Sequence, residues 1–186
     1  MSKAVLISIR PKWVEKIANG KKTIEVRKTK PKLETPFKCY IYCTRDKHLA
    51  FMQNASGTNL IACMDVDAAI PVGGSIGNGR IVGEFTCDRI YELAPLNHAP
   101  DDVEKQACLT REEIVNYLKG TGYGWHISDL RIYDTPKELS EFKPVCRVDF
   151  GCRACLHYDY AKMDCGEKVI SRPPQSWCYV DDVQAK

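Results

Sequence analysis

The composition of the 186-residue chain indicates a soluble globular protein, because 44% of its residues are hydrophobic and 27% are charged. Intrinsically disordered and collagen-like proteins are therefore excluded. Apolar runs such as residues 4–7 are much shorter than the ~20 residues that a membrane-spanning helix needs. Ser8 and Arg10 interrupt the first apolar segment, so it does not resemble a secretory signal. We expect a cytoplasmic protein with one domain over residues 1–186.

The net charge of +3 is distributed unevenly along the sequence. Residues 1–50 contain 13 Lys or Arg and 4 Asp or Glu, a net charge of +9, whereas residues 51–186 carry a net charge of −6. A basic N-terminal third can attract phosphates and indicates a nucleic-acid partner. A solvated lysine face has the same composition, and both interpretations stay open at this point.

The first residues predict a buried strand followed by a short helix. Residues 3–9 are mostly apolar, and Pro11 is favoured in the first turn of a helix. The pair Asn19-Gly20 is typical of a helix end, so the helix is expected between these two points.

Residues 22–27 predict a half-buried strand, since Ile24 and Val26 alternate with polar residues. We expect Ile24 and Val26 to enter the core. Lys22 has the same parity but stands at the end of the strand, where its long side chain can reach solvent.

The middle of the chain predicts alternating loops and strands. Residues 28–36 are rich in Lys and Pro and predict a loop, which a strand at residues 38–44 follows. Residues 45–59 are polar and predict a second loop, before a less regular strand at residues 60–66. A glycine-rich segment follows at residues 73–79.

The last part of the chain predicts three strands and a capped helix. Thr110 and Glu113 have the spacing of a capping box, so a helix is expected from there to about Gly120. A short helical turn is expected after Thr135. Strands are expected at residues 80–87, 123–133 and 172–180. Short strands with scattered turn signals favour a small barrel over a doubly wound sheet.

Ten cysteines in a chain of this kind are not expected to form disulfides, because the cytosol keeps thiols reduced. They are therefore buried thiols or metal ligands. Five of them lie within the last 41 residues: Cys146, Cys152, Cys155, Cys165 and Cys178.

The cysteine-rich segment predicts a structural zinc site. Two residues separate Cys152 from Cys155, which is the spacing of a zinc knuckle, and tetrahedral zinc needs four ligands. Residues 146–168 contain few aliphatic side chains, so a metal would supply stability that a core does not. The expected ligands are Cys146, Cys152, Cys155 and Cys165, with Cys178 or His157 as alternates. Free surface thiols and a redox Cys-x-x-Cys pair are the other interpretations.

Residues 6–28 resemble the opening of ASCH domains, a branch of the PUA-like superfamily. The signature of that family is a helix followed by Gly-x-Lys-x-x-Glu-x-Arg, which stands here as Gly20-Lys21-Lys22-Thr23-Ile24-Glu25-Val26-Arg27. Residues 124–127, 136–139 and 172–180 are similar to bacterial and prophage members with a cysteine-rich insert, here at about residues 144–171. The resemblance covers roughly residues 3–139 and 172–181.

The resemblance implies a fold and a ligand. The fold is α+β and mostly β, a PUA-like small β-barrel with two to three short helices and a zinc-stapled loop insert. The ligand is RNA or a nucleotide, held in a basic cleft beside the first helix. RNA binding is generally proposed for this family, some of its members are ribonucleases, and one branch of small bacterial members hydrolyses acetylated cytidine.

The candidate binding residues gather around the signature: Arg10, Lys21, Lys22, Glu25 and Arg27. Glu25 and Arg27 share one face of their strand, with side chains about 7 Å apart along it. Arginine binds phosphate in bidentate fashion and stacks on bases, and a carboxylate accepts from the amine of cytosine. A structural Arg–Glu pair is the alternative from the strand alone, and the resemblance favours the site.

Trp125 and His126 are further candidates, because aromatic rings stack on bases. A tryptophan on a strand is more often a core residue, and both interpretations stay open.

An enzyme is the alternative function, either a ribonuclease or an acetylcytidine amidohydrolase. The catalytic lysine of the hydrolase branch corresponds to Lys22, and Glu25 would act beside it. The threonine of that branch also corresponds to Glu25, where this chain departs from the pattern. A third hypothesis is a protein-interaction module that docks through the cysteine-rich insert.

Overall fold

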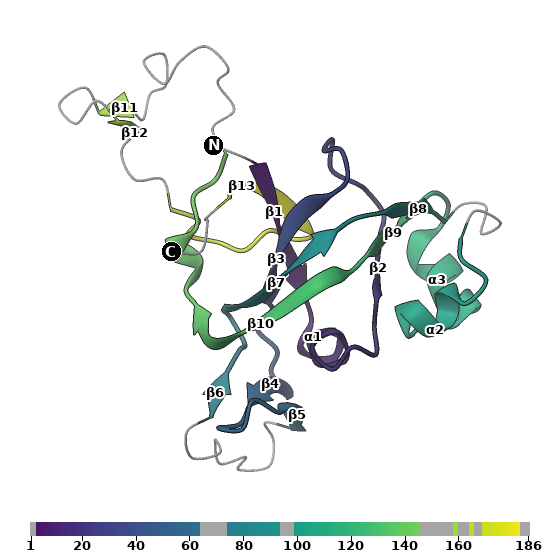
Figure 1. The fold of residues 1–186 in the computed structure, drawn as a ribbon, viewed down its shortest axis with the longest axis horizontal. Coiled ribbons are helices and arrows are strands. Elements are labelled where there is room, and N and C mark those ends of the chain that lie inside the picture. The colour runs from purple at the N-terminus through teal and green to yellow at the C-terminus, as the bar shows by residue number, and fades with distance from the viewer. Residues whose placement is uncertain are drawn as a thin grey trace.

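A computed structural model describes residues 3–63, 74–93, 99–145, 158–159, 164–165 and 169–182, with the two short pairs described by their backbone alone (Figure 1). The first half of the chain contains β1 (Lys3–Ile9), α1 (Pro11–Ala18), β2 (Ile24–Arg27), β3 (Phe37–Cys43), β4 (Leu49–Gln53), β5 (Asn59–Cys63), β6 (Ser75–Ile76), β7 (Ile81–Cys87) and β8 (Ile90–Glu92). The second half contains α2 (Val103–Ala107), α3 (Arg111–Leu118), β9 (Tyr123–His126), β10 (Ser128–Lys137), a 3-10 turn (Leu139–Glu141), β11 (Tyr158–Asp159), β12 (Asp164–Cys165) and β13 (Trp177–Asp181).

The strands divide among separate sheets rather than closing on one another. The largest sheet has the order β10-β7-β3-β1-β13, in which β1 and β3 are parallel and the other neighbours antiparallel (Figure 1). The other sheets are β2-β9-β8, β5-β4-β6 and the pair β11-β12. The predicted α+β, mostly β fold class with short helices is therefore confirmed.

The predicted closed barrel is wrong for the part of the chain that the structure describes. The five-stranded sheet ends at β10 and β13, which do not pair with each other over the residues described, and both sides of β1 are occupied by β3 and β13. Strand β2 pairs instead with β9, and together with β8 they form a sheet of their own.

The apolar run of β1 places this strand in the centre of the protein, as its sequence predicts. Val5 and Ile7 belong to a core that also contains Val14 and Ile17 of α1. Leu6, with the opposite parity, packs in a second core on the other face of the sheet. Burial on both faces makes the end of β1 a rigid base for the residues that follow it.

Helix α1 and the turn after it confirm the predicted start and stop signals. Pro11 occupies the first turn, and Asn19 is the C-cap residue. Gly20 then adopts φ +68°, a left-handed conformation that glycine takes without steric cost. The chain reverses direction at this glycine, and shortly before β2 the backbone N–H of Lys22 donates to the carbonyl of Lys16 at 3.0 Å.

Strand β2 differs from its predicted half-buried state, because both of its faces are covered. Ile24 and Val26 enter a core with residues of α2 and α3, as predicted. Glu25 and Arg27, on the opposite face, are also buried, with 6% and 7% of their surface exposed. Segments distant in sequence bury that face, and the alternation of polar and apolar residues along the strand cannot reveal such contacts.

The helix after Thr110 carries the predicted capping box: Thr110 Oγ1 accepts from the N–H of Glu113, and Glu113 accepts from the N–H of Thr110. Helix α2 and strand β4 were not predicted, since α2 has only five residues and β4 lies inside a polar stretch. Among the described helices, none is long and apolar enough to cross a membrane.

Candidate ligand-binding cavity

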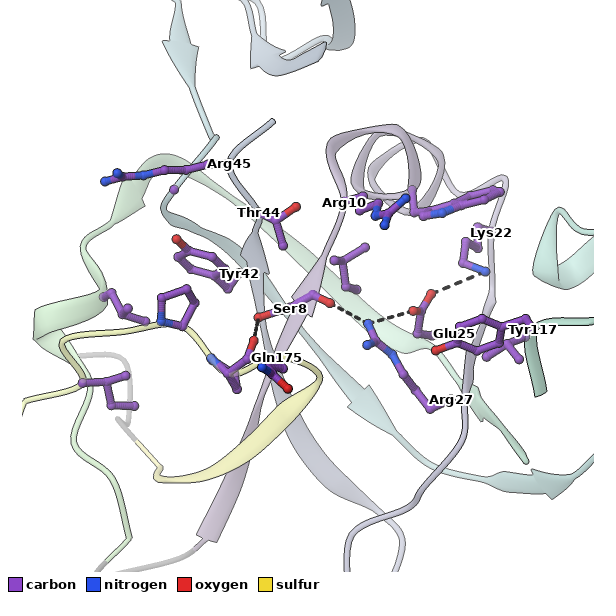
Figure 2. Close-up of a pocket in the computed structure, with 18 of the residues that line it drawn as sticks. Ser8, Arg10, Lys22, Glu25, Arg27, Tyr42, Thr44, Arg45, Tyr117 and Gln175 are labelled. Carbon is purple, nitrogen blue, oxygen red and sulfur yellow. Dashed lines mark hydrogen bonds and ion pairs between the residues drawn. The ribbon is translucent and has the colours of Figure 1, made fainter. Parts of the chain in front are cut away.

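A cavity of about 1090 Å³ lies where the end of β1 meets α1, β2 and α3 (Figure 2). Its walls come from seven parts of the chain: the segment from Ser8 to Trp13, strand β2 with Lys22, residues 42–45, Gly79, residues 109–117 with helix α3, residues 138–140, and residues 170–175 before β13. The cavity lies beside the first helix, where the cleft was expected. Its most buried polar residues are Lys22, Glu25 and Arg27.

Lys22, Glu25 and Arg27 form one connected group at the wall of this cavity (Figure 2). Arg27 Nη2 lies 2.9 Å from Glu25 Oε1, and Lys22 Nζ lies 3.4 Å from Glu25 Oε2. The single carboxylate therefore faces two cations, and with all three groups ionised the trio has a formal charge of +1. Removing such groups from water is costly unless each finds a partner.

Lys22 is held beneath α1 and against α2. Only 2% of the residue is exposed, and Nζ donates to the carbonyl of Ala107 at 2.7 Å. Nζ also lies 5.2 Å from the centre of the Trp13 ring, within cation–π range. The expectation that Lys22 reaches solvent is wrong, because α1 and α2 enclose its side chain.

Arg27 ties the cavity wall to two other segments. Nη2 donates to the carbonyl of Ser8 at 2.6 Å, and Nη1 donates to Ser176 Oγ at 3.3 Å. Ser8 Oγ in turn donates to the carbonyl of Pro174 at 2.6 Å. These bonds attach the end of β1 and the segment before β13 to β2, so the guanidinium has a fixed position.

The donors of the two cations exceed the acceptors that the described residues offer. An ammonium has three N–H groups, of which contacts with Ala107 and Glu25 account for two. Arg27 Nε is buried and has no partner among the described residues. A formal positive charge and unused donors together suit an anionic or carbonyl-bearing ligand.

The outer wall of the cavity is polar and aromatic and carries charges of both signs, since Glu113 and Glu138 line it along with the arginines. Arg10 and Arg45 are exposed and line the cavity, as does Tyr117 of α3, which is 44% exposed. Figure 2 shows Arg10 and Arg45 on the side of the cavity away from Arg27. Charged groups at this rim can meet phosphates while the buried trio contacts what lies deeper.

Four of the candidate binding residues come together at the cavity: Arg10, Lys22, Glu25 and Arg27. Lys21 does not line it. Its side chain is 66% exposed and lies 3.8 Å from Glu15. Adjacent lysines in the signature therefore occupy different environments, one in solvent and one in the cavity wall.

Trp125 and His126 also lie outside the cavity lining. Trp125 is fully buried and packs edge-on against Phe37 at 5.9 Å, so it is a core residue. His126 Nδ1 lies 2.6 Å from Asp88 Oδ1. Partial burial would raise the pKa of Asp88, but the hydrogen bond and charge of His126 lower that pKa below its usual value.

The predicted zinc ligands fall mainly outside the described residues. This applies to Cys146, Cys152, Cys155 and the alternate His157, while Cys165 is described by its backbone alone. The alternate Cys178 packs against the second core, and burial raises the pKa of its thiol. Within the described ranges, no group of three potential metal ligands occurs.

Sequence reasoning missed several residues of the cavity. Tyr42, Arg45 and Tyr117 line it through tertiary packing and carried no local motif, nor did Ser176, which holds Arg27 from outside the lining. Ser8 did carry a signal, since it is a hydroxyl in an otherwise apolar strand. Its burial with a hydrogen-bond partner is what such a residue requires.

The fold and the cavity together define a small α+β domain with buried cations at the wall of an open cavity. A comparison with family profiles identifies the family: the ASCH domain profile matches residues 7–120. The chain therefore belongs to the ASCH domain family, whose members are generally thought to bind RNA. A comparison with curated proteins found no match.

Solved structures of ZmASCH from Zymomonas mobilis have a similar fold. One single-residue variant aligns with a TM-score of 0.54 and 17% identity, covering 96% of this chain and 90% of that chain. The protein without a stated substitution aligns with a TM-score of 0.52 and 17% identity, covering 95% and 86%. At this identity the similarity concerns the fold.

Proposed function

We propose that this ASCH domain binds RNA or a nucleotide in the cavity beside α1. The observation that carries the proposal is the buried trio, in which one carboxylate, Glu25, stands between the two cations Lys22 and Arg27. An anionic ligand would complete the charge balance of this group. Membership of the family and the basic N-terminal third support the same class of ligand.

Each part of the cavity has a role in this proposal. Lys22 and Arg27 donate to phosphate or carbonyl oxygens, and Glu25 accepts from an exocyclic amine of a base. Arg10 and Arg45 at the rim meet backbone phosphates.

The test is the affinity of the Lys22→Met variant for a labelled single-stranded RNA and for a nucleoside monophosphate. Methionine keeps much of the length of the side chain and leaves Glu25 paired with Arg27. Loss of a charge-assisted hydrogen bond predicts about 10- to 100-fold weaker binding. Lys21→Met is the matched control, because that neighbouring lysine lies in solvent, and it should change affinity less than about twofold.

Thermal unfolding of both variants shows that they are folded before affinities are compared. Equal affinities of the two folded variants, or binding that does not weaken with salt, would contradict the proposal.

An enzyme acting on RNA or a modified nucleoside is the second candidate. The position of Lys22 favours an enzyme. Its Nζ lies 3.4 Å from Glu25 Oε2, and the lysine side chain is almost fully buried. A buried lysine beside a carboxylate can act as a nucleophile or transfer a proton. Turnover of RNA or acetylcytidine by the wild type, and none by Lys22→Met, would establish it. Equal rates for both proteins would exclude it.

We further propose that the insert at about residues 144–171 binds a structural zinc ion through Cys146, Cys152, Cys155 and Cys165. The spacing of the cysteines and the small number of aliphatic residues in the segment support this site. Elemental analysis of the purified protein should give one zinc per chain, and Cys152→Ser should lose it. A metal-free wild type would contradict the site, and retention of zinc by Cys152→Ser would remove Cys152 from the ligand set.

A further inference from the structure

The loop that follows Arg27 continues the positive charge of the cavity into solvent. Lys28, Lys30 and Lys32 are exposed at alternate positions, whereas Pro31 between them is buried. The loop connects β2 to β3 (Figure 1), and its first residue directly follows Arg27 in the cavity wall. Cationic side chains therefore continue from Arg27 in the cavity wall to Lys28, Lys30 and Lys32 at the surface.

Strand β13 anchors this loop with two aromatic side chains. Trp177 Nε1 donates to Thr29 Oγ1 at 3.0 Å, and the N–H of Lys32 donates to Tyr179 Oη at 2.6 Å. The two rings pack edge-on at 5.4 Å, and Trp177 also packs against the core residue Trp125 at 5.9 Å. The backbone that carries the three lysines is therefore attached to the core at two points.

Two aromatic rings lie beside these lysines: Tyr117 in the cavity lining, and Tyr123, which is partly buried against the core. Lys28 Nζ lies 5.4 Å from the centre of the Tyr117 ring, and Tyr117 lines the cavity with nearly half of its surface exposed. Lys30 Nζ lies 4.8 Å from the centre of the Tyr123 ring. An exposed ring beside cations, such as Tyr117, is a feature that binds single strands, since rings stack on bases and lysines meet phosphates.

The size of the cavity also favours a ligand larger than one nucleotide. Its volume of about 1090 Å³ is at the upper end of small-molecule sites, which span roughly 300–1,000 Å³. The one acidic contact along the described loop lysines is Glu92, which lies 3.4 Å from Lys30 with both side chains well exposed. Exposed pairs of this kind contribute little, so a phosphate can replace the carboxylate.

We propose that the ligand is a single-stranded RNA that continues beyond the cavity, with its next phosphates on Lys28, Lys30 and Lys32 and a base on Tyr117. This inference rests on the proposed function and adds to it that the ligand is a polymer with a defined exit from the cavity.

The experiment compares two ligands and two triple variants. Affinities for a nucleoside monophosphate and for a labelled RNA hexanucleotide are measured at several salt concentrations. The loop variant is Lys28→Gln, Lys30→Gln, Lys32→Gln. The control variant, Lys3→Gln, Lys105→Gln, Lys143→Gln, removes the same charge from exposed lysines outside the loop and the cavity lining.

The loop variant should bind the monophosphate as the wild type does and bind the hexanucleotide at least tenfold more weakly. The slope of log K against log salt should fall by about 2, since each single-strand phosphate contact contributes roughly 0.7. The control variant should keep most of the wild-type slope.

Two different results separate this inference from the proposed function. If the wild type binds both ligands with equal affinity, or if the loop and control variants lose hexanucleotide affinity equally, the inference is overturned and the cavity proposal stands. If the wild type binds neither ligand, both proposals are overturned.

Discussion

Glu25 holds together two cations that would otherwise repel each other inside the protein. Each of its oxygens contacts one cation, at 2.9 Å for Arg27 and 3.4 Å for Lys22. Replacing Glu25 with Gln leaves two buried positive charges without a carboxylate. Breaking a buried pair in this way costs about 3–5 kcal/mol of unfolding free energy, which urea denaturation can measure.

Glu92→Gln is the matched control for Glu25→Gln. Its carboxylate is also 3.4 Å from a lysine, Lys30, but both side chains lie largely in solvent. An exposed pair predicts a loss of about 0–1 kcal/mol. Similar losses in the two variants would show that the trio does not depend on its buried carboxylate.

The contact between Asp88 and His126 makes the stability of the folded protein depend on pH in the acidic range. Because the folded-state pKa of Asp88 lies below its unfolded value of about 3.9, its stabilising contribution is present above that pH and is lost as the pH falls through the folded value. Asp88→Asn should therefore lower Tm at pH 5 and have progressively less effect below about pH 4. Asp101→Asn, an exposed residue, is the control. A Tm difference from wild type that stays constant between pH 5 and pH 2 would contradict this role.

At the scale of elements, helix α3 brings Glu113 and Tyr117 to the cavity and is held at its start by the Thr110 capping box. Thr110→Ala removes the side-chain acceptor for the N–H of Glu113 and should cost about 1 kcal/mol of unfolding free energy. Thr121→Ala, at an exposed position outside the helix, should cost much less. Equal unfolding midpoints for the two variants would mean that the cap contributes nothing to stability.

The elements with strong local signals were predictable from the sequence. Strand β1, helix α1 and the start of α3 carry an apolar run, a proline with a glycine stop, and a capping box respectively. Helix α2 has only five residues and carries no comparable signal, whereas β4 carries an apolar run at residues 49–52 that the polar residues around it outweighed in the prediction of a loop. The closed barrel was wrong because the described edge strands β10 and β13 do not pair and β2 joins another sheet, and such pairing is a property of the whole chain that local patterns do not carry.

At the scale of the whole molecule, the site was only partly predictable. The signature identified Lys22, Glu25 and Arg27, but a strand pattern could not show that the face carrying Glu25 and Arg27 is buried. The segments that carry Ser8 and Ser176 contact Arg27 on that face, and these two residues are 168 positions apart in sequence. Trp125 could not be assigned from its residue type, because core and binding roles favour the same aromatic side chain.

The most direct test of the account is a crystal structure of the protein with a bound nucleoside monophosphate. We predict that the nucleotide lies in the cavity beside α1, with oxygens of its phosphate or base within hydrogen-bond distance of Lys22 Nζ or the Arg27 guanidinium. A nucleotide bound only at another surface, with the cavity filled by water and the trio untouched, would contradict the central claim.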